Sequence, residues 1–195
     1  MPLYLPTWPG PSEMTPRPVF ARNETRPGYG GPVGRNLRPG TRWAWNIALP
    51  PMSYEESLLW DDLLEEGDTV VMPILQPGLD LGAPGAPLVN GAMQSGRTLN
   101  LKGLTPGYLF RKGQWLSVIS QGQRYAYKSR ADATADGTGN LAVPLRTMIR
   151  YPLVNNAVVE IAEPKVEGWA TPDPDSFKVG TDGLVSPRFT IEERE

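Results

Sequence analysis

Two clusters of acidic residues contain most of the side chains in this sequence that could bind a metal ion or take part in catalysis. In the first, Asp132, Thr134, Asp136 and Gly137 are spaced nearly as in a calcium-binding loop. The pattern fails at Thr134, where an Asp or Asn is expected, and at Val143, where a bidentate Glu would complete the calcium shell. These residues therefore favour a plain hairpin reversal over a metal site.

The second cluster lies near the end of a predicted helix and contains Asp61, Asp62, Glu65 and Glu66. Each carboxylate near a helix C-terminus opposes the helix dipole by about 0.3 kcal/mol or more. A solvated helix face is the simplest interpretation of this cluster. Contact with basic side chains of a neighbouring subunit, or a place on a channel wall, is the alternative. A catalytic pair is disfavoured, because an acid and a base need unequal environments in one pocket.

The residue types that are missing exclude most catalytic chemistry. The chain has no His and no Cys, which removes most acid–base, nucleophilic and zinc chemistry. Neither a Ser-x-x-Lys nor a Gly-x-Ser-x-Gly motif occurs, and the glycines at 28–34 are flanked by prolines instead of the strand and helix of a dinucleotide site. We therefore expect a protein that is not an enzyme and that holds no metal and no cofactor.

Composition and charge set the broad class of the protein. The 195 residues include 22 Pro and 21 Gly, which is high but below the level of a low-complexity chain. With a net charge of -2, the chain lacks the strongly basic footprint of a phosphate-binding protein. No apolar run approaches the roughly 20 residues that span a bilayer, and no leader precedes the first prolines. We expect no sequence-specific nucleic-acid binding and no membrane association.

Short strands separated by glycine-rich turns predict a compact β module from Gly96 to Glu163. Its turn signals lie at 105–107, 121–122 and 136–140. Because no helical pattern separates the strands, we expect an antiparallel barrel or sandwich and not a parallel sheet. The strands are predicted at 97–101, 115–119, 123–127, 141–143 and 157–161.

One helix is predicted at 53–66, with strands before and after it at 42–49 and 69–75. Ser53 and Glu56 form a capping box, in which each side chain accepts the backbone N–H of the other residue. The helix has an apolar stripe that we expect to pack across a sheet, and it is followed by a glycine suited to a left-handed C-cap. The residues concerned are Leu59, Leu63, Trp60, Leu64 and Gly67.

The predicted fold is mainly β, an antiparallel sandwich or barrel with one capped helix and long Pro-rich extended arms. Its core spans 42–165 and includes a long loop at 76–91, unless residues 98–101 form the second strand of a long hairpin with that segment. The extended N-terminal arm covers 1–51, where prolines disfavour helix and central strand. The C-terminal arm covers 166–195.

A floppy leader is the alternative for the N-terminal arm, and the aromatic side chains disfavour it because a solvated disordered tail has few of them. Such an arm needs a surface to lie on, either on its own domain or on a neighbouring subunit. The candidate contact residues are Trp8, Phe20, Trp43, Trp169, Phe177 and Phe189. The last residues, 192–195, look like a charged tail, and 189–191 could add a strand to an exposed sheet edge.

The β module also carries a family resemblance. The segments "TLNLKGLTPGYLFRKGQWLSV", "GQRYAYKSRADATADGTGNLAVPL" and "MIRYPLVNNAVVEIAEP" follow one another as in a module of bacteriophage tail proteins. Together with the strand, "LPPM" and capped helix that precede them, they make the chain similar to distal tail proteins of siphophages and gene transfer agents. Gln114 departs from the family pattern, which has an acidic residue there, so a salt bridge at this position is not expected.

The resemblance implies a structural protein of the virion tail. A distal tail protein forms a ring, most often a homohexamer, that joins tail tube proteins to tail hub and tip proteins and leaves a channel for DNA. A carbohydrate or receptor-binding module of the tail tip is one alternative, with Trp115 or Trp169 as an exposed platform for a sugar. Another connector, such as a tail terminator or a head–tail joining protein, is a second alternative.

Overall fold

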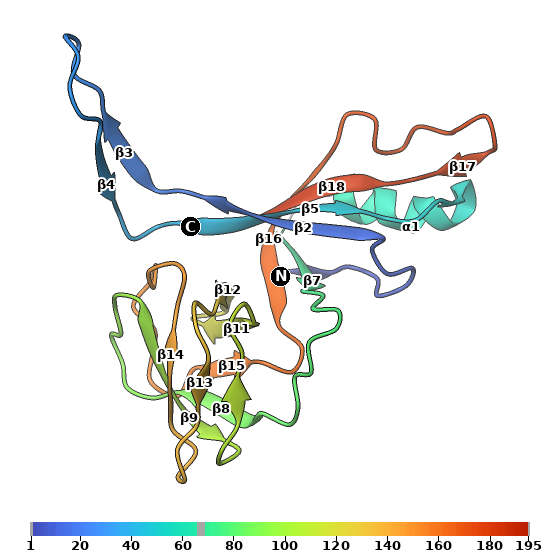
Figure 1. The fold of residues 1–195 in the computed structure, drawn as a ribbon. Helices are drawn as coiled ribbons and strands as arrows, with labels where there is room; N and C mark the ends of the chain where they lie inside the picture. Colours follow the sequence, from blue (N-terminus) through green and yellow to red (C-terminus); the bar gives the residue numbers. More distant parts are fainter. Residues whose placement is uncertain (1, 66–68, 195) are drawn as a thin grey trace.

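The structure is a computed structural model that describes residues 2–65 and 69–194. It is mainly β, with antiparallel sheets and one helix, as the sequence predicts, and it contains one parallel strand pair. The chain forms two β-sheet units (Figure 1). The buried side chains fall into two hydrophobic clusters, one in each unit, and the second cluster also takes in Trp115 and Ala126 of the other unit. We call residues 75–164 the inserted unit. The described residues before and after it form the split unit.

The inserted unit contains a six-stranded antiparallel sheet in the order β12-β11-β15-β8-β9-β14. The strands are β8 (Gly85–Val89), β9 (Thr98–Leu104), β11 (Trp115–Ser120), β12 (Gln123–Lys128), β14 (Leu141–Pro144) and β15 (Val158–Glu160). A short pair, β10 (Leu109–Phe110) and β13 (Ala133–Thr134), lies beside them. The predicted β module is therefore confirmed. The predicted loop at 76–91 is wrong over its second half, because β8 pairs with β9 as the long-hairpin alternative requires.

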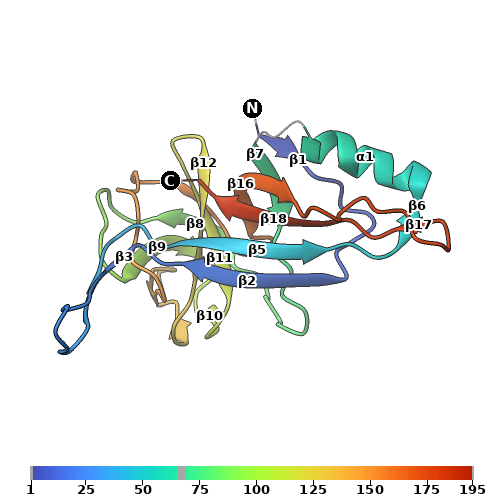
Figure 2. The same ribbon diagram turned by 90° about the horizontal axis from the view of Figure 1, so that it is seen from above.

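The split unit contains the second six-stranded sheet, in the order β1-β7-β16-β18-β5-β2. Its strands are β1 (Leu3–Tyr4), β2 (Glu13–Val19), β5 (Arg42–Ala48), β7 (Thr69–Pro73), β16 (Lys165–Pro172) and β18 (Arg188–Glu193). Two smaller pairs complete it, β3 (Arg22–Thr25) with β4 (Gly34–Leu37), and β6 (Met52–Ser53) with β17 (Leu184–Val185). Figure 2 shows β2, β5 and β18 side by side.

Helix α1 (Tyr54–Glu65) begins at the predicted capping box. The Ser53 N–H donates to Oε2 of Glu56 at 2.9 Å, and the Glu56 N–H donates to Oγ of Ser53 at 3.3 Å. Trp60 and Leu64 are buried against the sheet and Leu63 is partly buried there, which confirms the predicted packing stripe at these positions. The stripe is wrong at Leu59, which is 57% exposed on the outer face of the helix. The predicted C-cap, Gly67, lies outside the described residues. No helix within the described part of the chain is long and apolar enough to cross a membrane.

The N-terminal segment is only partly an extended arm. Strand β2 lies at one edge of the sheet and β1 at the other, so the structure incorporates these residues into the split unit. Pro16 and Pro18 lie in β2, two residues apart, so their missing N–H groups fall on the same side of the strand. An edge strand tolerates this arrangement because one side of it has no neighbour to pair with. Between β2 and β5, the β3–β4 hairpin projects away from the body of the molecule (Figure 1).

The predicted C-terminal arm at 166–195 is wrong. Strands β16 and β18 are the two central strands of the split-unit sheet, and Glu193 of the supposed charged tail is fully buried. The alternating apolar pattern of a strand is weak here, because the small residues Gly168 and Ala170 occupy inward positions of β16 while Trp169 faces outward. The single predicted core at 42–165 is corrected for the same reason, since the split unit draws on both ends of the chain.

Candidate functional site

The six aromatic residues predicted to contact a partner divide into two groups. Trp8, Phe20 and Trp169 are exposed, at 84%, 52% and 49% of their full accessibility, and Phe177 is half-buried against the core. Phe189 is buried at 1% exposure, so the prediction of partner contact is wrong for it. Trp43 is also mostly buried, at 7%, but one edge of it lines an open groove described below. They occupy inward positions of β5 and β18 in the core of the split unit, where Phe189 lies 6.1 Å from Trp60 between ring centroids.

The predicted acidic cluster lies on the outside of α1. Asp62 and Glu65 are exposed, Asp61 is half-buried, and Glu66 lies outside the described residues. Leu58 and Leu59 share the outer face of the helix and are exposed at 40% and 57%. This face is therefore acidic and apolar together, which is unusual for a purely solvated helix surface.

The turn at Asp132–Gly137 is a hairpin reversal built from local hydrogen bonds. One carboxylate oxygen of Asp136 accepts the Thr138 N–H, the Asn140 N–H and the Thr138 hydroxyl at 2.7–2.8 Å. These bonds, led by the one from Asn140, lower the pKa of Asp136 to about 2. The other acid, Asp132, accepts the backbone N–H of Lys112 at 2.6 Å. Within the described residues, no group of three or more acidic side chains is placed to hold a metal ion.

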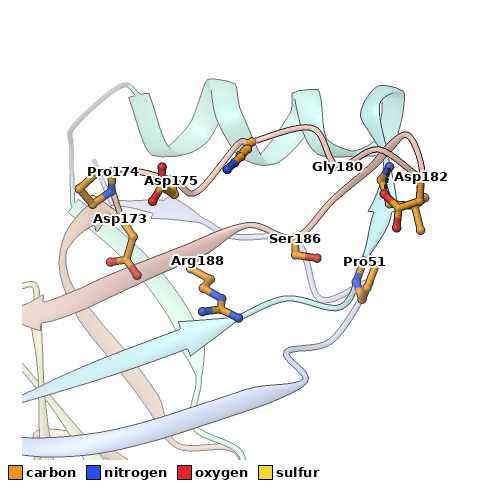
Figure 3. A pocket seen from close by; sticks show the side chains of 10 residues that line it. Pro51, Asp173, Pro174, Asp175, Gly180, Asp182, Ser186 and Arg188 are labelled. Atoms are coloured by element: carbon orange, nitrogen blue, oxygen red, sulfur yellow. Dashed lines mark hydrogen bonds between the residues drawn. The ribbon is translucent and has the colours of Figure 1, made fainter.

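An open groove of about 570 Å³ lies under the loop between β16 and β18 (Figure 3). Its acidic side chains are Asp173, Asp175 and Asp182, and Lys178 and Arg188 line it as well. Asp182 accepts the Leu184 N–H at 3.1 Å, so this carboxylate also stabilises a turn. The groove is wide and carries both signs of charge, and its geometry gives no water-excluding environment for acid–base chemistry.

A second groove, of about 480 Å³, lies where the two units meet, and it was not predicted. Pro18, Phe20 and Trp43 of the split unit line one part of it, and Thr147 with four cations of the inserted unit lines the rest. The cations are Arg97, Lys112, Arg130 and Arg146. We call this site the basic groove. Sequence reasoning missed it because its cations come from four separate segments of a chain whose net charge is slightly negative.

The side chains of the groove cations form no salt bridge within the described residues, although the Asp132 carboxylate accepts the backbone N–H of Lys112 at 2.6 Å. Across residues 2–65 and 69–194, no salt bridge joins any of the four to an acidic side chain. Lys128 lies beside them, because the Arg146 N–H donates to its carbonyl oxygen at 2.9 Å. Burial lowers the pKa of Lys128, and the charge of Arg146 lowers it further. A concentration of positive charge that is not held in salt bridges favours an anionic partner.

The projecting hairpin is the third exposed feature. Its two strands are held by main-chain pairing and by Glu24, which lies within 3.4 Å of the guanidinium groups of Arg22, Arg26 and Arg35. Tyr29 at its tip is fully exposed. A two-stranded ribbon without a sheet or helix behind it is marginally stable in water, so a neighbouring surface would stabilise it.

No protein-family model matches this chain, and no curated protein matches it. Its functional assignment therefore depends on the geometry of its surfaces and on the resemblance of its β module.

Two sequence-based expectations about individual residues are resolved by the fold. Trp115, a candidate sugar platform, is buried against Trp43 and Trp45, with ring centroids 4.7 and 5.3 Å away, so it is not exposed as that alternative requires.

Gln114 is also buried and forms no salt bridge. Its amide accepts the Arg111 N–H and donates to the Tyr108 hydroxyl, both at 2.9 Å. A neutral amide here avoids burying a charge.

Proposed function

We propose that this protein is a structural subunit of a phage-like tail. It would be a distal tail connector that assembles into a homohexameric ring around a channel for DNA. The projecting β3–β4 hairpin is the observation that carries the proposal. A ribbon that leaves its own body and ends in a fully exposed Tyr29 has the form of an assembly arm. The resemblance of the β module to distal tail proteins supports the same function.

The mechanism of such a connector is assembly and not catalysis. Contacts between unlike surfaces on successive copies close into a ring when the rotation per subunit divides a full turn. The hairpin would lie on the neighbouring subunit, and the exposed Trp8 and Trp169 would contact tail tube or hub proteins. A channel wall without a strong positive charge would let DNA pass without holding it.

The mass of the protein in solution tests this proposal. Light scattering across concentration should give a particle several times the 21.4 kDa chain, six times for a hexamer. A variant without residues 22–37 should stay monomeric. A two-residue Asn-Gly turn can join Ala21 to Arg38, because the Arg38 N–H already donates to the Ala21 carbonyl at 3.0 Å, as in the hydrogen bond that closes a hairpin turn. Neither hydrophobic core contains a residue of 22–36, so the thermal midpoint of the shortened variant should stay close to that of the intact monomer.

Limited proteolysis separates this proposal from the alternatives. Cleavage in the hairpin of the monomer, followed by protection on assembly or on addition of a tail protein, would support an assembly arm. A protected monomer at every concentration would contradict it. Glycan binding by isolated monomers that is lost in Trp169→Ala would favour a carbohydrate-binding module instead, because Trp169 is the surviving exposed candidate of that alternative.

A further inference from the structure

The basic groove and the outer face of α1 are complementary in charge and in apolar character. The groove combines Phe20, whose ring is half exposed, with four cations that form no salt bridge to any described acidic residue. The helix face combines Asp62 and Glu65 with the exposed Leu58 and Leu59. Arginine and carboxylate groups form strong charge-assisted hydrogen bonds when they approach one another, and apolar contact beside them adds burial.

The helix face is convex and regular, which suits insertion into a groove. Leu58, Asp62 and Glu65 are spaced by four and three residues, so they lie along one side of the helix. Among the described residues, neither Asp62 nor Glu65 is joined to a cation by a salt bridge. Both surfaces therefore carry charges that form no salt bridge within the described part of the monomer.

The two surfaces lie at opposite ends of the split-unit sheet. Strand β5 starts beside the basic groove, where Trp43 lines the wall, and ends at Ala48, shortly before the capping box that starts α1. At about 3.3 Å per residue, its seven residues separate the two ends by about 20 Å. Figure 1 shows α1 at one end of β5 and the inserted-unit strand β14 below the other end. The two surfaces cannot meet within one molecule.

We propose that the basic groove of one subunit receives the acidic outer face of α1 from a second copy of this chain, so that subunits join head to tail. This inference rests on the proposed assembly function and names the surfaces that it uses. Arg97 and Arg146 on one subunit contact Asp62 and Glu65 on the next. A contact of this kind is heterologous, because each subunit offers a different surface on each side, and repetition generates a ring or an open chain.

A nucleic acid is the competing occupant of the groove. Its phosphates would satisfy the four cations, but a phosphate backbone offers no apolar partner to Phe20 and leaves the leucine and acid face of α1 without a contact. The net charge of -2 also opposes the approach of a polyanion. The second copy explains both surfaces and is therefore preferred.

Two single-ended variants test the inference. The groove variant carries Arg97→Glu and Arg146→Glu, and the helix variant carries the neutral substitutions Asp62→Asn and Glu65→Gln. All four side chains are exposed, so folding is expected to be retained, and a thermal melt checks this. Glu163→Lys, at an exposed carboxylate away from both surfaces, is the matched control and should assemble like the wild type. Masses are measured by sedimentation velocity at low and high salt, because interfacial ion pairs weaken as salt screens them.

Each variant alone should be monomeric, and an equimolar mixture should give a heterodimer of twice 21.4 kDa that does not grow further. The mixture pairs the intact helix face of the groove variant with the intact groove of the helix variant. The acidic groove and the neutral helix face that are left over are not complementary, so extension stops. Assembly of each variant as large as that of the wild type would overturn this contact while leaving the ring proposal intact. A heterodimer in the mixture with open, growing wild-type chains would support the contact and contradict the ring.

Two further outcomes would overturn the inference. If the wild type and the mixture both remain monomeric at high concentration and low salt, the contact and the assembly function fail together. If a duplex oligonucleotide binds the wild type, the groove variant loses that binding and the mixture forms no heterodimer, the groove is a nucleic-acid site.

Discussion

Nη2 of Arg150 lies 2.7 Å from Oε1 of Glu193, and the two side chains are 6% and 0% exposed. The same carboxylate accepts the backbone N–H groups of Trp43 and Ala126, each at 2.7 Å. Because Trp43 belongs to the split unit and Ala126 to the inserted unit, Glu193 joins the two units. Burial raises the pKa of Glu193, while Arg150 and the two amide donors act in the opposite direction.

Removing this charge should be strongly destabilising. In Glu193→Gln the guanidinium of Arg150 stays buried without a carboxylate, and breaking one side of a buried ion pair costs about 3–5 kcal/mol. Urea unfolding of the monomer measures the loss. Glu163→Gln, at an acid that is 66% exposed, is the control and should change the free energy of unfolding by less than about 0.5 kcal/mol. Equal effects of the two substitutions would contradict a structural role for the buried pair.

Gly139 should tolerate no side chain. Its φ is 78°, and a Cβ there would collide with the carbonyl oxygen of Leu104, whose N–H donates to the Gly139 carbonyl at 3.1 Å. Gly139→Ala should therefore lower the free energy of unfolding by about 2 kcal/mol or more. Gly137 in the same turn has open space around its Cα, so Gly137→Ala is the matched control with a small effect. A harmless Gly139→Ala would show that the turn can move away from β9.

The Asp136 turn should give the protein an acid-labile contribution to stability. The folded-state pKa of about 2 lies below the ordinary value of 3.8, so the folded state binds a proton less readily than the unfolded state. The contribution is therefore complete above about pH 4 and is lost as the pH falls through about 2. Thermal midpoints of the wild type and Asp136→Asn, measured across this range, should differ most at neutral pH and converge in acid. A constant difference would indicate that the charge of Asp136 is not involved.

Trp115 should be essential to the contact between the two units. It projects from β11 against Trp43 and Trp45, and replacing a buried Trp by Ala costs about 3–5 kcal/mol because it leaves a cavity. Trp115→Ala is compared with Trp8→Ala by urea unfolding. Trp8 is 84% exposed, so its loss should have little effect on the monomer. A small effect of Trp115→Ala would mean that the aromatic cluster contributes little to holding the units together.

Local patterns in the sequence determined several parts of this structure. The hydrogen bonds of the capping box join residues three apart, Ser53 and Glu56, and those of the Asp136 turn reach four residues along the chain, to Asn140. Both are therefore predictable from neighbouring residues. The strands of the inserted unit can be predicted for the same reason, because alternating apolar residues and glycine-rich turns are short-range sequence signals. The mainly β fold, its one helix and its hairpin reversals follow from these signals.

Only the tertiary structure decided the split unit and the basic groove. Trp43 and Glu193, which are 150 residues apart, are joined by a hydrogen bond in the interior, and no local pattern distinguishes that carboxylate from a solvated charged tail. Strands β16 and β18 are central because distant chain segments cover them, and small inward residues conceal their alternation. The cations of the basic groove meet because the fold brings four separate segments together. Contacts between residues far apart in the sequence depend on the fold of the whole chain, so short-range sequence patterns cannot predict them.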